Sequence, residues 1–389
     1  MNTERWLILR EQRRAGDIFS VTRSSDDGGI SRAVDIFIEV KDLDRKEQHE
    51  LHTNPTVAGC APAFPMRLIA PVLEDAPSEF GCTWGVARVR ASSSRFTGAG
   101  VTIAVLDTGI EKHHPAFHGM ADRIEEADFT GEGNGDHNGH GTHCAGTIFG
   151  RDHDGLRYSV APGISRALIG KVLNADGNGS SESVCRGMVW ALERGANVVS
   201  MSIGFDFPGY AAQLQDSGMP PELATSKALE GYRMNIDLFG TLSAFIHKAG
   251  EDSMQGTIIV AAAGNESRRD KDPNFVITAP PPAASDHIIA VGAISRDGKI
   301  ARFSNANPDL VAPGVHIFSA HLNGKFARLN GTSMATPHVA GVAALWAEKL
   351  RTGARFAPAK TLTARVLGTA QEIDGVPLTD QGTGVVQSP

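Results

Sequence analysis

The chain has 389 residues, 41% of them hydrophobic and 21% charged, which suffices for one large domain or about two to three ordinary ones. Its formal net charge of −7 is mild for this length and argues against nucleic acid as the main partner. Four cysteines, at positions 60, 82, 144 and 185, lack the spacing of a metal site, and we expect no disulfide framework.

The start of the chain contains the short apolar run Trp6 to Leu9, which arginines follow at once. This run is far shorter than the core of a secretory signal, and no stretch of the sequence approaches the length of a membrane span. We therefore expect a cytoplasmic protein that has no membrane partner.

Residues 1–76 are predicted to form a small α+β unit. RWLILRE and AVDIFIEV are strand-like runs, RKEQHELH is a polar helical segment, and VAGCAPAF is a third strand-like run. The order is therefore strand, strand, helix and strand. The next segment, FPMRLIAPVLEDAPSEFG, carries prolines and has no steady periodicity, which is typical of a linker. We assign residues 77–95 to the linker and the entry to the next domain.

Residues 96–389 are predicted to form an α/β domain with a mainly parallel sheet and helices on both faces. Short β-branched runs alternate there with helical segments; the runs are GVTIAVLD, ALIGKVL, ANVVSMSI, GTIIVAAAGN and HIIAVGAI. Several are apolar on both faces, as in parallel strands that helices cover. Active residues of such sheets gather at the carboxyl ends of the strands.

Two strand ends and one helix start in this domain carry candidate functional side chains. Asp107 ends VTIAVLDTGI, where an acid is either a turn or cap residue or a functional group. His140 and His143 lie three residues apart in HNGHGTHCAGTIFG, and a helix beginning there would put both imidazoles on one side. A metal site is the alternative, although no carboxylate or cysteine completes a known zinc spacing.

Asn265 follows the apolar run in TIIVAAAGNES. It either stabilises a turn or donates its amide N–H to an oxyanion.

A serine lies where the segment NGTSMATPHVAG passes from a loop into an apolar helix. Ser333 is either the N-cap of that helix or a nucleophile at a helix N-terminus, where backbone donors favour negative charge.

The order Asp107, His140, Ser333 in the chain is the order of the catalytic triad in subtilisins. The segments VLDTGI, GHGTHCAG, AAAGN and GTSMATPHVAG resemble the motifs of subtilisin-like serine proteases, and the resemblance covers residues 84 to about 387. It implies a subtilisin-like fold in which Ser333 is the nucleophile, His140 the base and Asp107 the residue that orients the imidazole. It also implies an oxyanion hole formed by Asn265 and the backbone N–H of Ser333.

The same resemblance implies where the substrate binds. The strand SMSIG would pair with the substrate main chain, and the residues after the next strand would form the wall of the first pocket. These substrate-binding candidates are Ser200, Met201, Ser202, Ile203 and Gly204, followed by Ala262, Ala263 and Gly264.

Between Gly204 and Asn265 the chain is longer than a compact subtilisin requires, and we predict an insertion at about residues 205–235. Leu229, Ile236, Phe239, Leu242 and Ile246 recur at helical spacing and predict a long amphipathic helix. Residues 205–221 are either a surface loop or a lid over the substrate cleft.

We predict no cofactor and no metal. A structural calcium is the open alternative, because some subtilisins hold one, but Ala116 stands where they often place a carboxylate ligand. Asp152 and Asp154 offer oxygen ligands in an acidic loop that is otherwise simply solvated. Cys144 is expected to be a small buried residue, and the resemblance implies a position under the active site without a catalytic role.

The unit of residues 1–76 resembles the inhibitory propeptide of this family in size and position. APAFPMRLIAP is then the candidate tail that lies in the cleft, and the alternative is a permanent regulatory domain. We expect a serine endopeptidase that acts on a peptide or protein substrate, with its own N-terminal unit as an inhibitor. A peptide ligase or macrocyclase with the same acyl-enzyme and a catalytically silent peptide-binding protein are the alternatives.

Overall fold

The computed structural model describes residues 3–11, 36–71 and 80–389. Residues 33–35 of the predicted strand AVDIFIEV and residues 72–79 of the linker-like segment lie outside the described residues.

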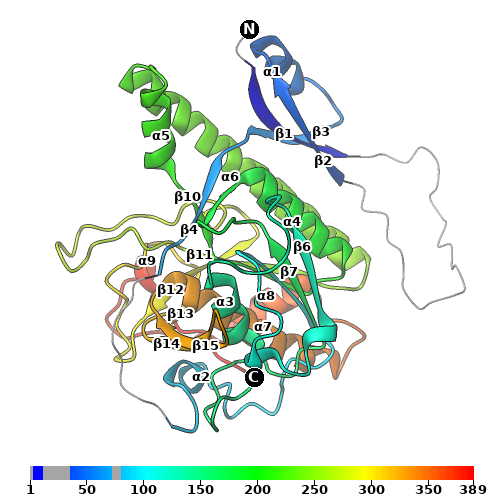
Figure 1. Ribbon diagram of the computed structural model, residues 1–389, viewed down its shortest axis with the longest axis vertical. Coiled ribbons are helices and arrows are strands. Elements are labelled where there is room, and N and C mark those ends of the chain that lie inside the picture. The colour runs from blue at the N-terminus through cyan, green and yellow to red at the C-terminus, as the bar shows by residue number, and fades with distance from the viewer. Residues whose placement is uncertain (1–2, 12–35, 72–79) are drawn as a thin grey trace, which may run out of the picture.

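A seven-stranded sheet forms the centre of the molecule (Figure 1). All neighbouring strands in it run parallel. In spatial order the strands are β13 (Leu310–Pro313), β12 (Ile288–Ile294), β11 (Ile258–Ala262), β9 (Val198–Met201), β5 (Thr102–Asp107), β7 (Arg166–Lys171) and β6 (Ile124–Asp128). The predicted α/β class is therefore confirmed, and each of the five apolar runs contributes a strand.

Helices cover both faces of this sheet because successive strand residues point to opposite sides. In β5, Ile103 and Val105 belong to one hydrophobic core, whereas Ala104 and Leu106 belong to the other. The first core contains residues of α3 (His140–Phe149) and α7 (Thr332–Arg351), and the second contains residues of α4 (Ser181–Glu193) and α6 (Pro221–Asp252).

Shorter elements complete the large domain. They are α2 (Trp84–Arg88), two 3₁₀ turns (Pro115–Phe117 and Ala121–Arg123), the hairpin of β14 (Ile317–His321) and β15 (Lys325–Leu329), α8 (Ala359–Gly368) and α9 (Leu378–Gln381). None of the helices among the described residues combines the length and the apolar character that crossing a membrane requires.

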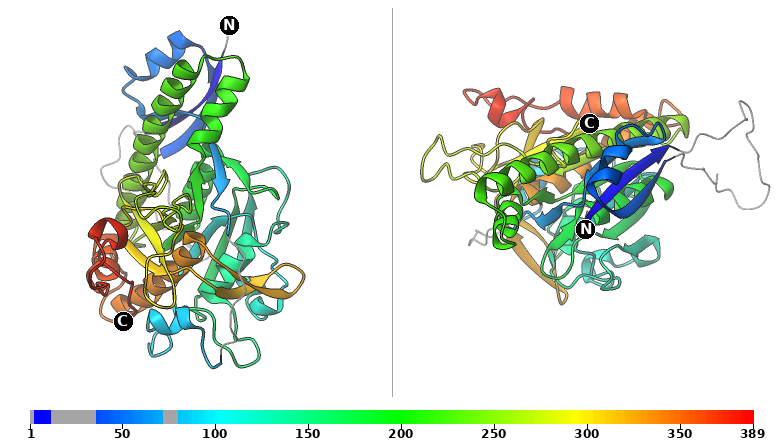
Figure 2. Two further views of the ribbon diagram at one scale, coloured as in Figure 1. Left: turned by 90° about the vertical axis from the view of Figure 1, so that its left-hand side faces the viewer. Right: turned by 90° about the horizontal axis from the view of Figure 1, so that it is seen from above.

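The N-terminal unit is a three-stranded antiparallel sheet in the order β2-β1-β3 with one helix. Its elements are β1 (Glu4–Glu11), β2 (Ile36–Leu43), α1 (Arg45–Leu51) and β3 (Val57–Pro62), in the predicted order. The Asp44 carboxylate accepts from the N–H groups of Lys46 and Glu47, which fixes the start of α1. Ion pairs join the unit to α6 and α4, from Glu4 to Lys227 and from Arg5 to Glu182. Figure 2 shows the unit beside α6, at the opposite end of the molecule from the C-terminal residues.

The insertion predicted at about residues 205–235 forms α5 (Phe207–Asp216) and the first part of α6. The segment 207–216 is helical, so the prediction of a surface loop there is wrong; Asp206 caps this helix by accepting from the N–H of Gly209. The predicted long helix is confirmed, but Leu229 is 58% exposed and lies outside its buried face.

Small residues, not large ones, make the buried face in the first half of α6: Ala224, Ala228, Gly231 and Asn235. The helix packs there against β3 and the chain after it. Because a side chain at Gly231 would crowd Phe64 and Pro62, small residues are what lets the strand approach the helix. A buried face made of small residues gives no hydrophobic periodicity, and this explains why the sequence pattern wrongly assigned Leu229 to the buried face.

Three further strands form a small sheet outside the central sheet, and this small sheet connects the two units. β4 (Pro65–Leu68) pairs antiparallel with β10 (Ile203–Phe205) on one edge and with β8 (Asn178–Ser180) on the other. The residues after the N-terminal unit thus form the middle strand of a small sheet on the large domain.

Candidate active site

The carboxyl end of β5 carries the first of the predicted site residues. Asp107 is fully buried, and its Oδ1 accepts from the backbone N–H of Thr108 at 2.8 Å and from His140 Nδ1 at 2.8 Å. Gly109 follows with a φ of +109°, and a Cβ there would meet the Gly135 carbonyl oxygen. The strand can therefore turn sharply after Asp107 only because this residue is glycine.

His140 is the first residue of α3, after Gly139, which has a φ of +98°. The Asp136 carboxylate holds this helix start: it accepts from the Thr108 hydroxyl and from the backbone N–H groups of Gly139 and Thr142. Asp136 itself is 8% exposed. Asp136 carries no distinct signal in the sequence, because an acid in a polar, glycine-rich loop looks like a solvated turn residue.

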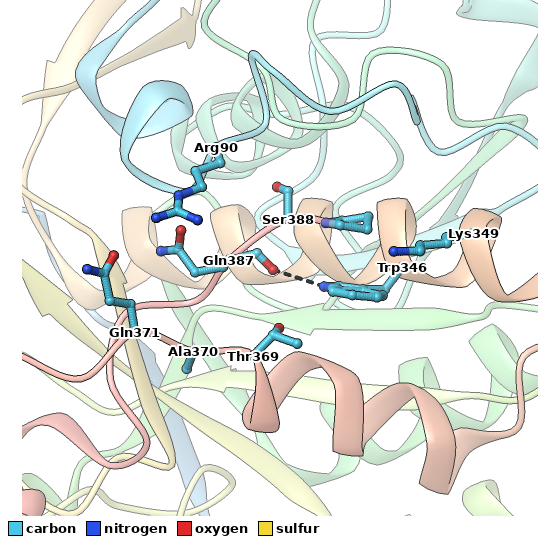
Figure 3. Close-up of a pocket in the computed structure, with 9 residues that line it drawn as sticks. Arg90, Trp346, Lys349, Thr369, Ala370, Gln371, Gln387 and Ser388 are labelled. Atoms are coloured by element: carbon cyan, nitrogen blue, oxygen red, sulfur yellow. Dashed lines mark hydrogen bonds between the residues drawn. The ribbon is translucent and has the colours of Figure 1, made fainter.

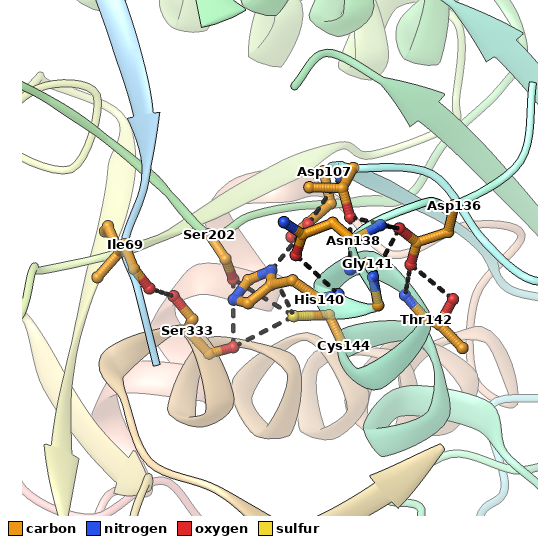
Figure 4. Close-up of polar contacts among 12 residues, drawn as sticks. Ile69, Asp107, Asp136, Asn138, His140, Gly141, Thr142, Cys144, Ser202 and Ser333 are labelled. Carbon is orange, nitrogen blue, oxygen red and sulfur yellow. Dashed lines mark hydrogen bonds and ion pairs between the residues drawn. The ribbon is translucent and has the colours of Figure 1, made fainter. Parts of the chain in front are cut away.

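The buried His140 imidazole is polarised by its neighbour. Burial disfavours the protonated ring, but the Asp107 carboxylate and the neighbouring Cys144 together outweigh burial, so the pKa of His140 lies well above its ordinary value of 6.5. Within the described part of the chain, its Nε2 has no hydrogen-bond partner. The Nδ1 contact to Asp107 leaves Nε2 as the ring nitrogen on the side of Ser333 (Figure 4).

Cys144 lies one helical turn after His140 and is buried, as predicted. Its thiol donates to the Ser333 carbonyl oxygen at 3.4 Å, and its sulfur lies 3.8 Å from His140 Nδ1. Burial raises the pKa of this thiol, which disfavours the thiolate.

His143 does not share the site with His140, so the expectation that both imidazoles face one side is wrong. Its Nε2 lies 3.0 Å from the Ile317 carbonyl oxygen on the hairpin, and burial lowers its pKa to about 3. A residue three positions along a helix is rotated by about 300°, and here that rotation is enough to aim His143 at β14.

Ser333 is the second residue of α7, and the N-cap of that helix is Gly331. Capping the helix is therefore not its role. The side chain is fully buried, and its hydroxyl donates to the carbonyl oxygen of Ile69 at 3.1 Å (Figure 4).

Asn265 follows β11 and is held by the start of α7. Its Oδ1 accepts from the N–H and the hydroxyl of Thr332, at 2.9 and 3.0 Å. These bonds fix the amide so that Nδ2 points the other way, and Nδ2 donates to the carbonyl oxygen of Ala70 at 3.2 Å.

The main chain of residues 65–70 thus runs across the candidate site. Leu68 pairs with Ile203 and Arg67 with Gly204, and the N–H of Leu68 donates to the Gly177 carbonyl oxygen at 2.8 Å. Ser200 and Met201 lie on β9, where both edges are already paired inside the central sheet. The predicted substrate-pairing segment is therefore too wide, and pairing with the tail begins at Ile203.

The side chain of Ile69 is 4% exposed, and its Cγ1 lies 3.4 Å from the Cβ position of Gly204. Pro280 Cγ lies 3.3 Å from the same position. The Ser202 hydroxyl donates to the Ser333 carbonyl oxygen at 3.2 Å. Ala262, Ala263 and Gly264 are buried and lead from β11 to Asn265.

Comparison with known proteins agrees with this arrangement. The subtilase family model matches residues 98–385. The chain is a subtilase.

Its sequence is 35% identical over 272 residues to Subtilisin BL of Lederbergia lenta, covering 68% of this chain and 84% of that protein. It is 36% identical over 257 residues to the major intracellular serine protease of Bacillus subtilis (strain 168), covering 64% of this chain and 68% of that protein. Subtilisin DY of Bacillus licheniformis is 33% identical over 276 residues, which covers 69% of this chain and 85% of that protein. This subtilase is accordingly a serine endopeptidase.

One group of potential metal ligands occurs among the described residues of this subtilase. The ligand atoms of Asp107, His140 and Cys144 lie within 4.8 Å of one another, inside the site itself. Asp154, from the predicted acidic loop, has a side chain that is 91% exposed and lies 3.5 Å from His153 Nε2.

A separate hollow of about 520 Å³ lies beside the C-terminal residues of the subtilase (Figure 3). Arg90, Trp346, Lys349 and Gln387 are among its lining residues, and the Lys349 ammonium lies 4.7 Å from the centre of the Trp346 ring. None of Asp107, His140, Asn265 or Ser333 lines it.

The electrostatics of the site give a first testable prediction. Asp107→Asn removes the carboxylate that raises the pKa of His140 and leaves burial as the largest effect on it, so this pKa should fall. NMR titration of the imidazole resonances measures it. His338, whose pKa burial lowers to about 4, is the internal control and should keep its value. An unchanged His140 pKa would remove Asp107 as the cause.

Proposed function

We propose that this subtilase hydrolyses peptide bonds through an acyl-enzyme on Ser333, with His140 as the base and Asp107 as the orienting acid. The observation that carries the proposal is the tail: a peptide main chain lies in the cleft with one carbonyl at the Ser333 hydroxyl and the next at Asn265 Nδ2. A substrate would take the same path as an added strand between β8 and β10.

The geometry supports a definite sequence of proton transfers. His140 Nε2 takes the proton of the Ser333 hydroxyl as the oxygen attacks the scissile carbonyl carbon, and the imidazolium that forms is stabilised by Asp107. His140 then delivers that proton to the leaving amine. Water next attacks the acyl carbon while His140 Nε2 takes its proton. His140 then returns the proton to the Ser333 oxygen as the acyl bond breaks, and the acid product leaves.

Asn265 Nδ2 would stabilise the oxyanion of both tetrahedral intermediates, together with the N–H of Ser333. The bonds from Thr332 to Asn265 Oδ1 hold this donor in place before the reaction begins. A donor that needs no reorientation stabilises developing negative charge most effectively.

We further propose that the N-terminal unit inhibits the enzyme through residues 64–71. The Ile69 side chain lies against Gly204, but the Ile69 carbonyl accepts from the Ser333 hydroxyl, and Asn265 reaches the following carbonyl, that of Ala70. The nucleophile and the oxyanion donor thus contact carbonyls of two different residues. The hydroxyl hydrogen also points to the tail and not to His140 Nε2. This register favours occupation of the cleft over cleavage.

Ser333→Ala should abolish hydrolysis of a peptide substrate and labelling by a fluorophosphonate while leaving the fold intact, because it removes only the attacking oxygen. Ser93→Ala, at an exposed serine, is the matched control and should retain both activities. Retained hydrolysis in purified Ser333→Ala would show that the nucleophile is another residue. Product masses separate hydrolysis, which adds one water, from ligation, which adds none.

Asn265→Ala should lower kcat by about 10²–10³-fold with little change in KM, the loss typical of one oxyanion donor, because this contact strengthens in the transition state. Steady-state kinetics on one peptide measures both constants. A change confined to KM would place Asn265 outside the oxyanion hole.

Hydrolysis should rise with pH as His140 loses its proton, because only the neutral imidazole accepts the serine proton. Since the Asp107 carboxylate raises the pKa of His140, the midpoint of the rise in kcat/KM should lie above 6.5. A profile of kcat/KM that is flat between about pH 5 and about pH 8 would contradict the role of His140.

The intact chain should hydrolyse peptides slowly, and cleavage between Phe64 and Trp84 should accelerate it. A tethered blocker acts at an effective concentration of about millimolar, so weak contacts suffice. N-terminal sequencing of the wild type and of Ser333→Ala, expressed side by side, measures the processing. A new N-terminus in that window should occur in the wild type alone. If both chains stay whole and the intact wild type is fully active, the N-terminal unit is not an inhibitor.

A further inference from the structure

An aromatic ring of the tail is enclosed by the insertion. The Phe64 side chain is 1% exposed. Its ring stacks on Phe205 with centroids 4.5 Å apart and planes 8° apart, and it lies 4.4 Å from the centre of the Tyr210 ring. Phe205 ends β10, Tyr210 belongs to α5, and Gly231 of α6 forms the third wall.

The third wall is shaped for a ring. A Cβ at Gly231 would lie 3.3 Å from Phe64 Cε2 and 3.4 Å from Pro62 Cγ, so even a methyl group would crowd the occupant. Gly231 is in the interior of a helix without a positive φ, where glycine is normally a cost to stability. Space for the ring is the benefit that this glycine provides.

The pocket is in fixed register with the active site. Phe64 lies five residues before Ile69, the residue against Gly204, and the chain between them is the strand β4. Two hydrogen bonds with Ser181 continue the main-chain path to the pocket. The Phe64 N–H donates to the Ser181 hydroxyl at 3.0 Å, and the Ser181 N–H donates to the Phe64 carbonyl oxygen at 2.9 Å. Any extended peptide that pairs with β8 and β10 as β4 does would therefore bring the side chain at this position to the same walls.

We propose that Phe205, Tyr210 and Gly231 form a substrate-binding pocket for an aromatic side chain, five residues before the residue that lies against Gly204. The proposal rests on the proposed function, because a substrate reaches the pocket only when the tail has left it. The tail is then a template of the substrate: Phe64 shows the kind of side chain that the insertion recognises. Stacked and tilted aromatic pairs add specificity beyond the burial of apolar area.

The test uses the full-length chain and two peptides that differ at one position. Both carry the sequence of residues 64–69 followed by a readily cleaved bond, and one has Ala in place of the Phe. The ratio of their kcat/KM values on one preparation cancels any change in the fraction of active sites that are free of the tail. In the wild type we expect a preference of at least about tenfold for the Phe peptide, from the apolar area of one ring.

Variants of the pocket residues test whether the preference for the Phe peptide arises at this pocket. Gly231→Leu fills the pocket, and Tyr210→Ala removes one of its walls. Both variants should bring the ratio of kcat/KM values close to one. Hydrolysis of the Ala peptide should change only as much as the fraction of active sites that are free of the tail. Leu229→Ala changes an apolar residue on the exposed face of the same helix and should keep the full ratio. A wild-type ratio near one would overturn the proposal and leave the pocket as a docking site for the tail alone.

A binding measurement separates this inference from the proposed function. In the full-length double variant Ser333→Ala, Phe64→Ala, the pocket lacks its own ring and no peptide is cut. Fluorescence anisotropy of the same two peptides, labelled at their ends, should give at least about tenfold tighter binding of the Phe peptide. Equal binding refutes the pocket even if the wild type is active. A preserved preference in the double variant, together with a wild-type chain that no fluorophosphonate labels, refutes only the proposed function.

Discussion

The pairing of β4 on both of its edges is the interaction on which the arrangement of the two units depends. Its hydrogen bonds to β8 and β10 fix a peptide main chain in the cleft. They thereby place Ile69 and Ala70 at Ser333 and Asn265, and Phe64 at the insertion. Because main-chain bonds carry no side-chain preference, such a strand binds many sequences, and selectivity must come from the pockets beside it.

The buried contact between Asp107 and His140 places a second constraint on the large domain. A buried carboxylate is tolerated only when it is paired or hydrogen-bonded. The turn at Gly109 and the Asp136 network supply that setting by holding β5 and the start of α3 together. The contact between Asp107 and His140 therefore depends on Gly109 and Asp136, which have no part in the proposed reaction.

The sequence places Asp107 and Asn265 at the ends of two apolar strands, and a parallel sheet brings such ends to one edge; the roles expected of them come from the resemblance to subtilisin-like proteases. It also predicts the order of the N-terminal elements and an extended tail. It misses Asp136 and the aromatic pocket, because both depend on contacts between segments far apart in the chain, such as Phe64 with Tyr210. The strand β6, with the sequence IEEAD, escapes hydrophobic patterning because an edge strand leaves its polar side chains partly exposed. Leu229 and His143 were misplaced because spacing alone does not fix which face of a helix is buried.

Amide hydrogen exchange of full-length Ser333→Ala, which cannot cut its own tail, tests whether the tail is a paired strand in the active site. The amide of Leu68 donates to the Gly177 carbonyl at 2.8 Å. It should exchange at least about 100-fold more slowly than in an unstructured peptide of the same sequence. Exchange of Leu68 at the rate of the unstructured peptide would mean that the cleft is open, and the account of a self-occupied active site would be wrong.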